Sequence, residues 1–275
     1  PTGSGKTLSG FLPTLIELES SEFFGLHTIY VSPLKALASD IKRNLMIPIE
    51  EMGLNIRVED RTGDTTAAIK RRQRVDPPHI LLTTPESLAL LISFPESKTL
   101  FANLRRIVVD EIHALVESKR GHQLVLAISR LQSLCANLRK IGLSATVDRP
   151  EEVANFISDN KANCPIIFAK SGVDPNISML KTKTLPPWAG AGATYAIPDV
   201  LEKISDHKTT LIFHNTRAQA EIFFHNLWLN NKNNLPIAIH HGSLDLDQRK
   251  RVEAAIFKGE LRAIVCTGTL DLGID

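Results

Sequence analysis

The first seven residues, PTGSGKT, have the types and the spacing of a loop that binds phosphate. Gly5, Lys6 and Thr7 match the last three positions of the pattern G-x-x-x-x-G-K-[ST]. Gly3 and Gly5 would let successive backbone N–H groups point at phosphate oxygens, because no Cβ stands in the way. Lys6 would reach the phosphates, and the Thr7 hydroxyl would ligate Mg²⁺. A Gly-Ser turn that happens to end in Lys-Thr is the alternative interpretation.

A second chemical pair, Asp110 and Glu111, follows the most hydrophobic run of the chain in the stretch IVVDEIHAL. An apolar strand that delivers two adjacent carboxylates to its C-terminal edge suits metal-assisted phosphoryl transfer. Asp110 would hold Mg²⁺ through its water shell, and Glu111 would orient and deprotonate the attacking water. Two solvated acids at a strand end are the ordinary alternative, but the phosphate loop upstream favours the catalytic interpretation.

The histidines and hydroxyls near these runs carry weaker signals. His113 follows the two acids, but the zinc pattern H-E-x-x-H is absent. His240 and His241 are adjacent, so on a strand their side chains point to opposite faces. Metal ligation by a histidine is therefore not expected. Ser144 and Thr146, in IGLSATV, indicate an ordinary turn when taken alone.

The elements that must position these residues are short β-branched, apolar runs, each followed by a longer helical stretch. This alternation is typical of a parallel sheet covered on both faces. The expected strands are residues 27–33, 79–85, 105–111, 139–146, 209–215, 236–242 and 261–268. We therefore expect an α/β fold with two domains, residues 1–172 and 198–275, joined by a Pro- and Gly-rich linker over 173–197.

The composition fits a globular protein of one large domain or two ordinary ones. The chain has 275 residues, 43% hydrophobic and 23% charged, so it can bury a sizeable core. Its formal net charge of +2 excludes a globally basic surface, so any nucleic-acid contact must be local. No apolar run approaches the roughly 20 residues that span a bilayer, and no membrane partner is expected. Three well-separated cysteines suit a reducing cytosol, so a cytoplasmic location is expected.

Several short motifs follow one another in a specific order, and together they carry a family resemblance. They are PTGSGKT, SPLKALASD, TTPES, VVDEIHA, LSAT, LIFHNTRAQAE, HHGSL and TGTLDLGID. In this order and with these gaps, the chain resembles superfamily 2 helicases of the DEAD/DEAH-related kind. RTGDTTAAIKRRQ, ESKRGHQL and HHGSLDLDQRKRVEAA narrow the resemblance to the large helicase-related (Lhr) family. PPWAGAGATYAIP is similar to the ligase-associated bacterial branch of that family.

The resemblance implies two RecA-like P-loop NTPase domains with parallel sheets, and ATP bound in the cleft between them. The catalytic residues that it implies are Lys6, Asp110, Glu111 and His113. His113 would link the nucleotide to the coupling residues Ser144 and Thr146, and the Mg²⁺ ligands would be Thr7 and Asp110. The implied nucleotide-binding residues are Thr2, Gly3, Ser4, Gly5, Lys6, Thr7, Gly273 and Asp275.

The nucleic-acid contacts that the resemblance implies come from loops of small residues at strand ends. Backbone donors and helix N-termini there can hold a phosphate backbone without reading bases. In the first domain these residues are Ser32, Pro33, Lys35, Thr62, Gly63, Thr65, Thr84 and Pro85. In the second domain they are Asn215, Arg217, His241, Gly242, Ser243, Thr267 and Thr269. For any single loop, Ser and Thr are equally well explained as helix N-caps. The run KRRQR (70–74) fits either a nucleic-acid patch or the solvated face of a helix.

The expected function is an ATP-dependent helicase or translocase that couples Mg-ATP hydrolysis to movement on a single strand. DNA is the expected substrate, with RNA as the alternative, and the expected role is of the DNA-repair type. The resemblance also suggests DNA-ligase and nuclease partners. Two alternatives stay open: a duplex translocase that does not separate strands, and a non-catalytic nucleic-acid-binding remnant of a broken gene.

The sequence also departs from the family pattern in ways that should matter. Gly268 stands where relatives usually carry a hydroxyl, which would weaken one phosphate contact. A strand before Pro1 and an arginine motif after Asp275 belong to the family pattern and are not in the sequence. The resemblance therefore implies a fragment with a truncated second domain, and this segment alone is expected to be almost inactive.

Overall fold

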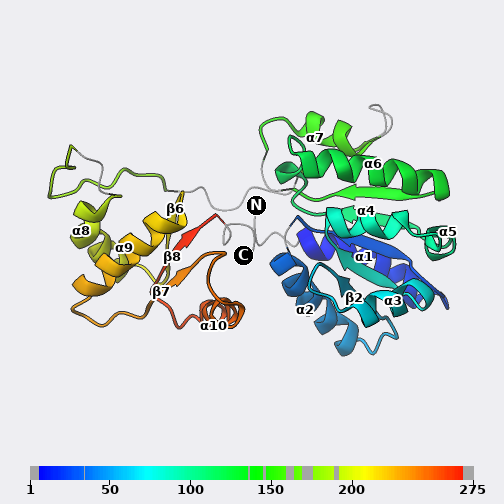
Figure 1. The fold of residues 1–275 in the computed structure, drawn as a ribbon, viewed down its shortest axis with the longest axis horizontal. Coiled ribbons are helices and arrows are strands. Elements are labelled where there is room, and N and C mark those ends of the chain that lie inside the picture. Colours follow the sequence, from blue (N-terminus) through cyan, green and yellow to red (C-terminus); the bar gives the residue numbers. More distant parts are fainter. Residues whose placement is uncertain are drawn as a thin grey trace. The chain divides into compact units, whose positions relative to one another are not determined.

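The computed structural model describes residues 6–33, 35–135, 137–144, 147–158, 164–168, 176–188 and 192–268. The chain divides between residues 174 and 175 into two compact units (Figure 1). Each unit has its own sheet and its own hydrophobic clusters.

The first unit is built on a sheet that has five strands within the described residues, all of them parallel. Their order across the sheet is β2-β3-β1-β4-β5. The strands are β1 (Thr28–Val31), β2 (Val58–Arg61), β3 (Ile80–Thr83), β4 (Arg106–Val109) and β5 (Arg139–Gly142). Because the strands run the same way, their carboxyl ends meet at one edge, which is where ligands bind in such sheets.

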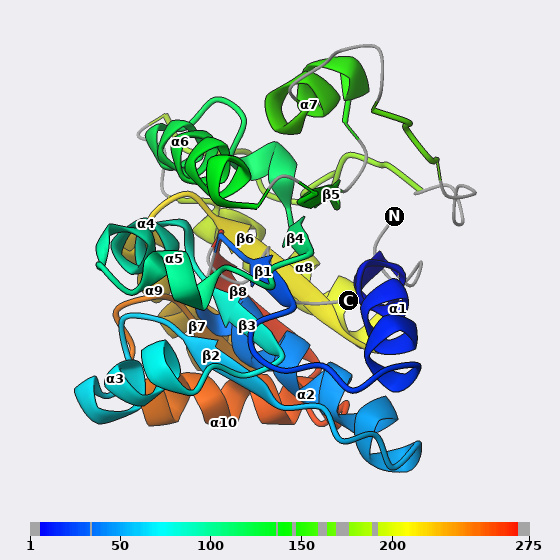
Figure 2. The same ribbon diagram turned by 90° about the vertical axis from the view of Figure 1, so that its right-hand side faces the viewer.

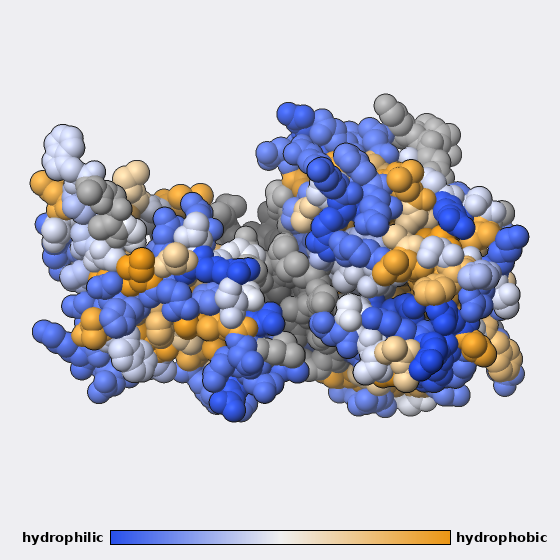
Figure 3. Space-filling view, viewed as in Figure 1, coloured by the Kyte–Doolittle hydropathy of each residue, from blue (hydrophilic) through white to orange (hydrophobic). Residues whose placement is uncertain are grey.

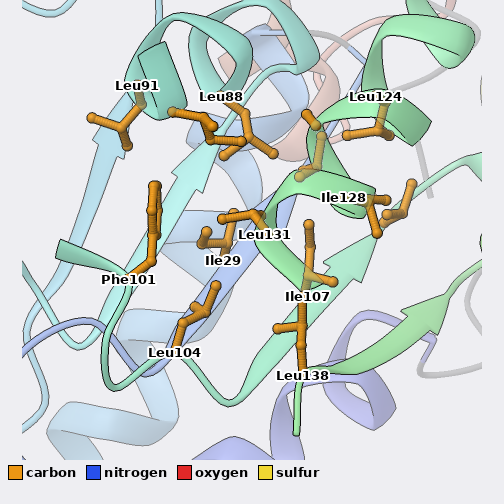
Figure 4. Close-up of a cluster of buried hydrophobic side chains, with 14 of the residues drawn as sticks. Ile29, Leu88, Leu91, Phe101, Leu104, Ile107, Leu124, Ile128, Leu131 and Leu138 are labelled. Carbon is orange, nitrogen blue, oxygen red and sulfur yellow. The ribbon is translucent and has the colours of Figure 1, made fainter. Parts of the chain in front are cut away.

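Helices cover both faces of this sheet, as Figure 2 shows from the side of the first unit. They are α1 (Lys6–Glu19), α2 (Lys35–Glu51), α3 (Ala67–Val75), α4 (Pro85–Ser93), α5 (Ser97–Leu100), α6 (Lys119–Leu134) and α7 (Pro150–Ile157). Side chains alternate along a strand, so Ile29 and Ile107 pack with α4 and α6 on one face (Figure 4). Tyr30 and Val108 pack with α1 and α2 on the other face. A fully buried leucine such as Leu131 contributes about 2 kcal/mol to such a core.

The first sheet differs from the sequence prediction at β2. The stretch VEDR has one apolar residue among four, so it gave no apolar run to recognise. Within the part of the chain that the structure describes, β2 pairs on one side only, with β3, and Glu59 and Asp60 are half-buried at this sheet edge. Polar residues are tolerated in edge strands, because only part of the strand is buried. The remaining strands are shorter than the predicted runs at their ends, where loop residues begin.

The second unit contains a parallel sheet of three strands within the described residues, in the order β6-β8-β7. The strands are β6 (Thr210–His214), β7 (Ile237–His240) and β8 (Ala263–Thr267). The helices are α8 (Ile197–Asp206), α9 (Arg217–Asn230) and α10 (Leu246–Phe257), with a 3₁₀ turn, η3 (Thr194–Ala196), before α8. Val265 packs with residues of α8 and α9, whereas Ile264 faces α10, so helices cover both faces.

Several helices begin where the sequence offers a capping side chain. The hydroxyls of Thr66, Ser118 and Thr216 each accept a hydrogen bond from the backbone N–H three residues later. Pro150 opens α7, where its missing N–H costs nothing. Both units show a mixture of hydrophilic and hydrophobic residues in the view of Figure 3. Among the described residues, no helix is long and apolar enough to cross a membrane.

Candidate nucleotide and nucleic-acid site

Helix α1 packs closely at Gly10 on Val108, near the carboxyl end of β4, and on Leu143, just after β5. A Cβ on Gly10 would stand 2.9 Å from Leu143 Cδ1 and 3.3 Å from Val108 Cγ1. Helix α1 begins at Lys6, and Lys6 and Thr7 are both half-buried in its first turn. The N-terminus of a helix attracts anions, so this turn is suited to a phosphate group.

Asp110 and Glu111 lie at the end of β4, as the sequence predicted. Asp110 is 5% exposed, and its backbone N–H donates to the carbonyl of Val31 (2.9 Å) on the neighbouring strand. The Glu111 N–H donates to Asp110 Oδ1 (2.9 Å). Glu111 itself has left-handed backbone angles, with φ 44° and ψ 43°. A residue other than glycine rarely adopts them, and such strain often marks functional positions.

The structure brings His113 next to both Glu111 and Ser144. His113 lies in the 3₁₀ turn η1 (Ile112–Ala114), which is tied to β5 by the Ile112 N–H donating to the Leu143 carbonyl (3.0 Å). His113 Nδ1 is 3.1 Å from Ser144 Oγ and 3.5 Å from Glu111 Oε2. The His113 imidazole therefore connects the loop after β5 to Glu111, and a movement of that loop would shift the surroundings of the two carboxylates.

Tyr30, which the sequence analysis did not single out, lies beneath this site. Its ring is fully buried and stacks on Phe11 of α1, with ring centroids 4.6 Å apart and planes at 12°. Burial raises the pKa of Tyr30, and the negative charge of Asp110 raises it further. Its hydroxyl therefore stays protonated beside Asp110. The signal in the sequence was a tyrosine within a nearly continuous apolar strand, since a buried phenol needs a polar neighbour.

The predicted nucleic-acid residues of the first unit lie in three loops. Ser32 and Pro33 follow β1 and are buried, and the Ser32 N–H donates to the Thr83 carbonyl (2.9 Å). Thr62 and Thr65 close a loop after β2, in which the Thr62 N–H donates to Thr65 Oγ1 (3.0 Å). Gly63 is exposed in that loop, and its carbonyl accepts from Lys70 Nζ (3.2 Å).

The third loop supports the capping interpretation of its hydroxyl. Thr84 is 4% exposed, and its Oγ1 accepts from the Ser87 N–H (3.4 Å) and donates to Ser87 Oγ (3.2 Å). Pro85 occupies the first position of α4 and is buried. The Thr84 side chain is thus occupied as an N-cap, so this loop would offer a phosphate its backbone and its helix start.

The basic run 70–74 lies on α3, where several of its side chains have partners within the protein. Arg72 pairs with Glu59 of β2. The guanidinium of Arg74 lies 4.2 Å from the ring centroid of Phe94 and its Nε is 4.0 Å from Glu96 Oε1. These contacts favour the interpretation of this run as a helix face packed on its own domain.

Three of the predicted residues of the second unit, Arg217, His241 and Ser243, form one hydrogen-bonded group after the carboxyl ends of β6 and β7. Arg217 Nη1 donates to Ser243 Oγ (2.5 Å), and the Ser243 N–H donates to His241 Nδ1 (3.2 Å). Because Nδ1 accepts, the proton of a neutral His241 is on Nε2, which lies 2.7 Å from Glu221 Oε1. Glu221 was not predicted, and its position on α9, one turn beyond Arg217, was its only signal.

The other predicted residues are placed as follows. Asn215 and Gly242 are exposed, and Thr267, at the end of β8, is 7% exposed. Outside the described residues lie Thr2, Gly3, Ser4, Gly5, Thr146, Thr269, Gly273 and Asp275, as does the side chain of Lys35.

Comparison with known proteins places both units in helicase families. The family model for the DEAD/DEAH box helicase matches residues 1–154, and that for the helicase conserved C-terminal domain matches residues 194–275. These matches, with the relatives below, confirm the family resemblance and the α/β fold with parallel sheets.

Two curated relatives are named ATP-dependent helicase Lhr-Core. The Lhr-Core protein 2 of Thermococcus barophilus is 40% identical to this chain, and the Lhr-Core helicase of Methanocaldococcus jannaschii is 39% identical. Each match covers 100% of this chain but only 34% of the relative, so the chain spans about a third of their length. A solved structure, the Mycobacterium smegmatis helicase Lhr bound to ssDNA and AMP-PNP, matches with a TM-score of 0.81 at 35% identity. That match covers 100% of this chain and 38% of the solved one.

Proposed function

Because this chain belongs to the DEAD/DEAH box helicase family, we propose that it is the part of an ATP-dependent helicase that couples ATP hydrolysis to movement on single-stranded DNA. The observation that carries this proposal is the group at the end of β4. There Asp110 is buried, Glu111 has a strained backbone, and His113 contacts Ser144, so that each of these residues lies next to another of the group. A structural strand end has no need of this arrangement.

In the proposed reaction the residues of the chain bind phosphates, orient water and move a proton. Lys6 and the first turn of α1, with the preceding loop, bind the phosphates of ATP. Glu111 takes a proton from the attacking water, and its left-handed backbone sets the direction of its carboxylate. His113, 3.1 Å from Ser144, transmits the state of this site to the loop after β5, in which Ser144 and Thr146 are the proposed coupling residues.

Magnesium is the proposed metal cofactor, held by Thr7 and Asp110. The fit rests on the donor set, since a hydroxyl and a buried carboxylate are the hard oxygen donors that Mg²⁺ prefers. When bound, the ion would neutralise charge that develops on the transferred phosphoryl group.

DNA is the proposed substrate because the M. smegmatis helicase that this chain resembles was solved bound to ssDNA. We further propose a role of the DNA-repair type in the cytoplasm, with DNA-ligase and nuclease partners. This finer proposal is supported by the resemblance of PPWAGAGATYAIP to the ligase-associated branch and by three cysteines that lie far apart in the sequence. Co-purification of a DNA ligase with the protein would test the partners.

The test of the function is phosphate release from Mg-ATP by the protein that contains this chain, with single-stranded DNA, duplex DNA or RNA added. We expect single strands to stimulate release most. Glu111→Gln should lower kcat by about 10²- to 10⁴-fold while ATP still binds, because shape is kept and the base is lost. Glu117→Gln, an exposed acid beyond the 3₁₀ turn, is the matched control and should leave kcat unchanged.

Other outcomes would identify other functions. Stronger stimulation by duplex, without strand separation, would favour the duplex translocase. No turnover with any nucleic acid, or full turnover in Glu111→Gln, would contradict the catalytic proposal.

A further inference from the structure

Arg120, at the start of α6, joins two of the candidate nucleic-acid loops of the first unit. Its Nη2 donates to the carbonyl of Pro33 (2.7 Å), in the loop after β1. Its Nε and Nη2 donate to the two carboxylate oxygens of Glu86 (2.5 and 3.2 Å), in the first turn of α4. One guanidinium thus connects segments that lie 87 and 34 residues away in the sequence.

We propose that Arg120 is a positioning residue that holds these two loops, through Pro33 and Glu86, in the shape that accepts a nucleic-acid backbone. The inference rests on the proposed function and adds a residue outside the loops themselves. In the sequence, Arg120 appears only within the stretch ESKRGHQL.

The start of α6 is built so that Arg120 cannot move away easily. The Ser118 hydroxyl accepts from the Gly121 N–H (3.0 Å) and donates to the Leu115 carbonyl (2.9 Å). A Cβ on Gly121 would stand 1.9 Å from that same Leu115 oxygen. The helix start is therefore pressed against the turn that follows η1, which fixes where the Arg120 backbone lies.

The contact with Arg120 also explains why an acidic residue, Glu86, can lie in a loop that is proposed to bind nucleic acid. Glu86 is half exposed at 47%, and unpaired it would repel phosphates. The Arg120 hydrogen bonds lower the pKa of Glu86, so the carboxylate stays charged and remains a firm acceptor. Arginine is suited to this task, since its planar fork can hold a carboxylate and a carbonyl together, whereas a lysine ammonium is a point charge.

A direct contact between Arg120 and a phosphate is the competing explanation, and it makes opposite predictions. If Arg120 binds phosphate, Arg120→Lys keeps the charge and much of the affinity. Glu86→Gln would then free the arginine and remove a negative charge, so affinity would rise or stay the same. If Arg120 braces the loops, both substitutions break the connection, and affinity falls in both.

The experiment measures the Kd for labelled single-stranded DNA by fluorescence anisotropy, using the protein that contains this chain. We expect Arg120→Lys and Glu86→Gln each to raise Kd by about tenfold, the effect of losing a charged hydrogen bond. Arg57→Lys is the matched control. Arg57 makes the same kind of contact, with both oxygens of Asp76 (2.7 and 2.8 Å) and the Pro77 carbonyl (2.6 Å). Arg57 lies at the opposite end of the sheet, before β2, so the Kd of the Arg57→Lys variant for single-stranded DNA should match that of wild type.

A second measurement tests the brace without nucleic acid. Hydrogen exchange at the Ser32 and Ser87 amides should speed up in both variants and stay unchanged in Arg57→Lys, because these amides belong to the braced loops. Wild-type affinity in either variant, or unchanged exchange at both amides, overturns the inference. Failure of wild type to bind single-stranded DNA would instead overturn the proposed function, while the exchange data would still decide whether the brace exists.

Discussion

Glu111 shows how one residue can be read in two ways. In sequence it is the second of two acids after an apolar run, which is enough to suggest a base. The structure adds that its backbone is left-handed, which costs about 1–3 kcal/mol unless the surroundings enforce it. The contacts that hold Glu111 in this conformation are the hydrogen bonds made by the backbone groups of Ile112 and Leu143, on either side of the turn. No sequence pattern reports them, since they join different strands.

His27 is a buried residue whose protonation should lower stability in mild acid. It is 1% exposed, with Nδ1 2.8 Å from Thr28 Oγ1 and Nε2 3.1 Å from Glu17 Oε2. Burial lowers the pKa of His27 to about 4; the Glu17 charge opposes this and the Arg106 charge adds to it. In the unfolded state His27 has an ordinary histidine pKa of about 6.5. Between this pKa and the lower pKa of the folded state, His27 is protonated in the unfolded state but neutral in the folded state.

We predict that the first unit loses stability as the pH falls from about 6.5 to 4. Above pH 6.5 His27 is neutral in both states and has no effect, and the loss should reach about 3 kcal/mol near pH 4. The measurement is urea unfolding at a series of pH values. His27→Gln should be less stable at pH 7 but should lose less on acidification. His122→Gln, an exposed histidine on α6, should behave as wild type, and an equal acid loss in His27→Gln would refute the assignment.

At the scale of elements, the strands with apolar runs were predictable and the polar one was not. Residues of β1, β3 and β4 are buried from end to end, so their sequences read as nearly continuous apolar runs, with Thr28, Thr83 and Arg106 at the strand ends. The edge strand β2 reads VEDR and left no such signal. The contacts of Arg120 with Glu86 and Pro33 were equally hidden, because they join separate loops whose meeting depends on the whole sheet.

Gly121 is the clearest element-scale test, because its neighbour is backbone. Gly121→Ala should lower the free energy of unfolding by about 3 kcal/mol, since the 1.9 Å approach to the Leu115 oxygen forces the start of α6 outward. Chemical denaturation gives the measurement.

Gly10→Ala is the informative comparison for Gly121→Ala. There the new methyl would meet the end of the Leu143 side chain at 2.9 Å, which can shift, and helix propensity gains about 1 kcal/mol. We expect a change close to zero. If both substitutions lower the free energy of unfolding by a similar amount, the turn before α6 can move aside more easily than the 1.9 Å distance suggests.

For the whole molecule, the near balance of charge decides how nucleic acid can be bound. With 32 basic and 30 acidic residues, the long-range field is weak and contacts must come from a few loops. In the proposed function, those loops would offer phosphate their backbone donors and hydroxyls, which do not distinguish bases.

We therefore predict that DNA affinity hardly varies with sequence, and that it falls with salt in proportion to the lysine and arginine side chains that neutralise phosphates. Each phosphate neutralised in this way adds about 0.7 to the slope of log Kd against log salt for a single strand. Titrations of homopolymers and mixed sequences over a salt series would measure both. A footprint confined to one short sequence would contradict this expectation.

The division into two units, each with its own cores, also sorts the chromophores of the chain. Both tryptophans, Trp188 and Trp228, belong to the second unit, whereas Tyr30 is the tyrosine of the first. Tryptophan emission therefore follows the second unit alone, without any label. A tryptophan introduced for Phe94, beside the α4–α6 cluster, in a variant in which Trp188 and Trp228 are replaced would report on the first unit alone, so that the two halves of this chain could be followed in two matched samples.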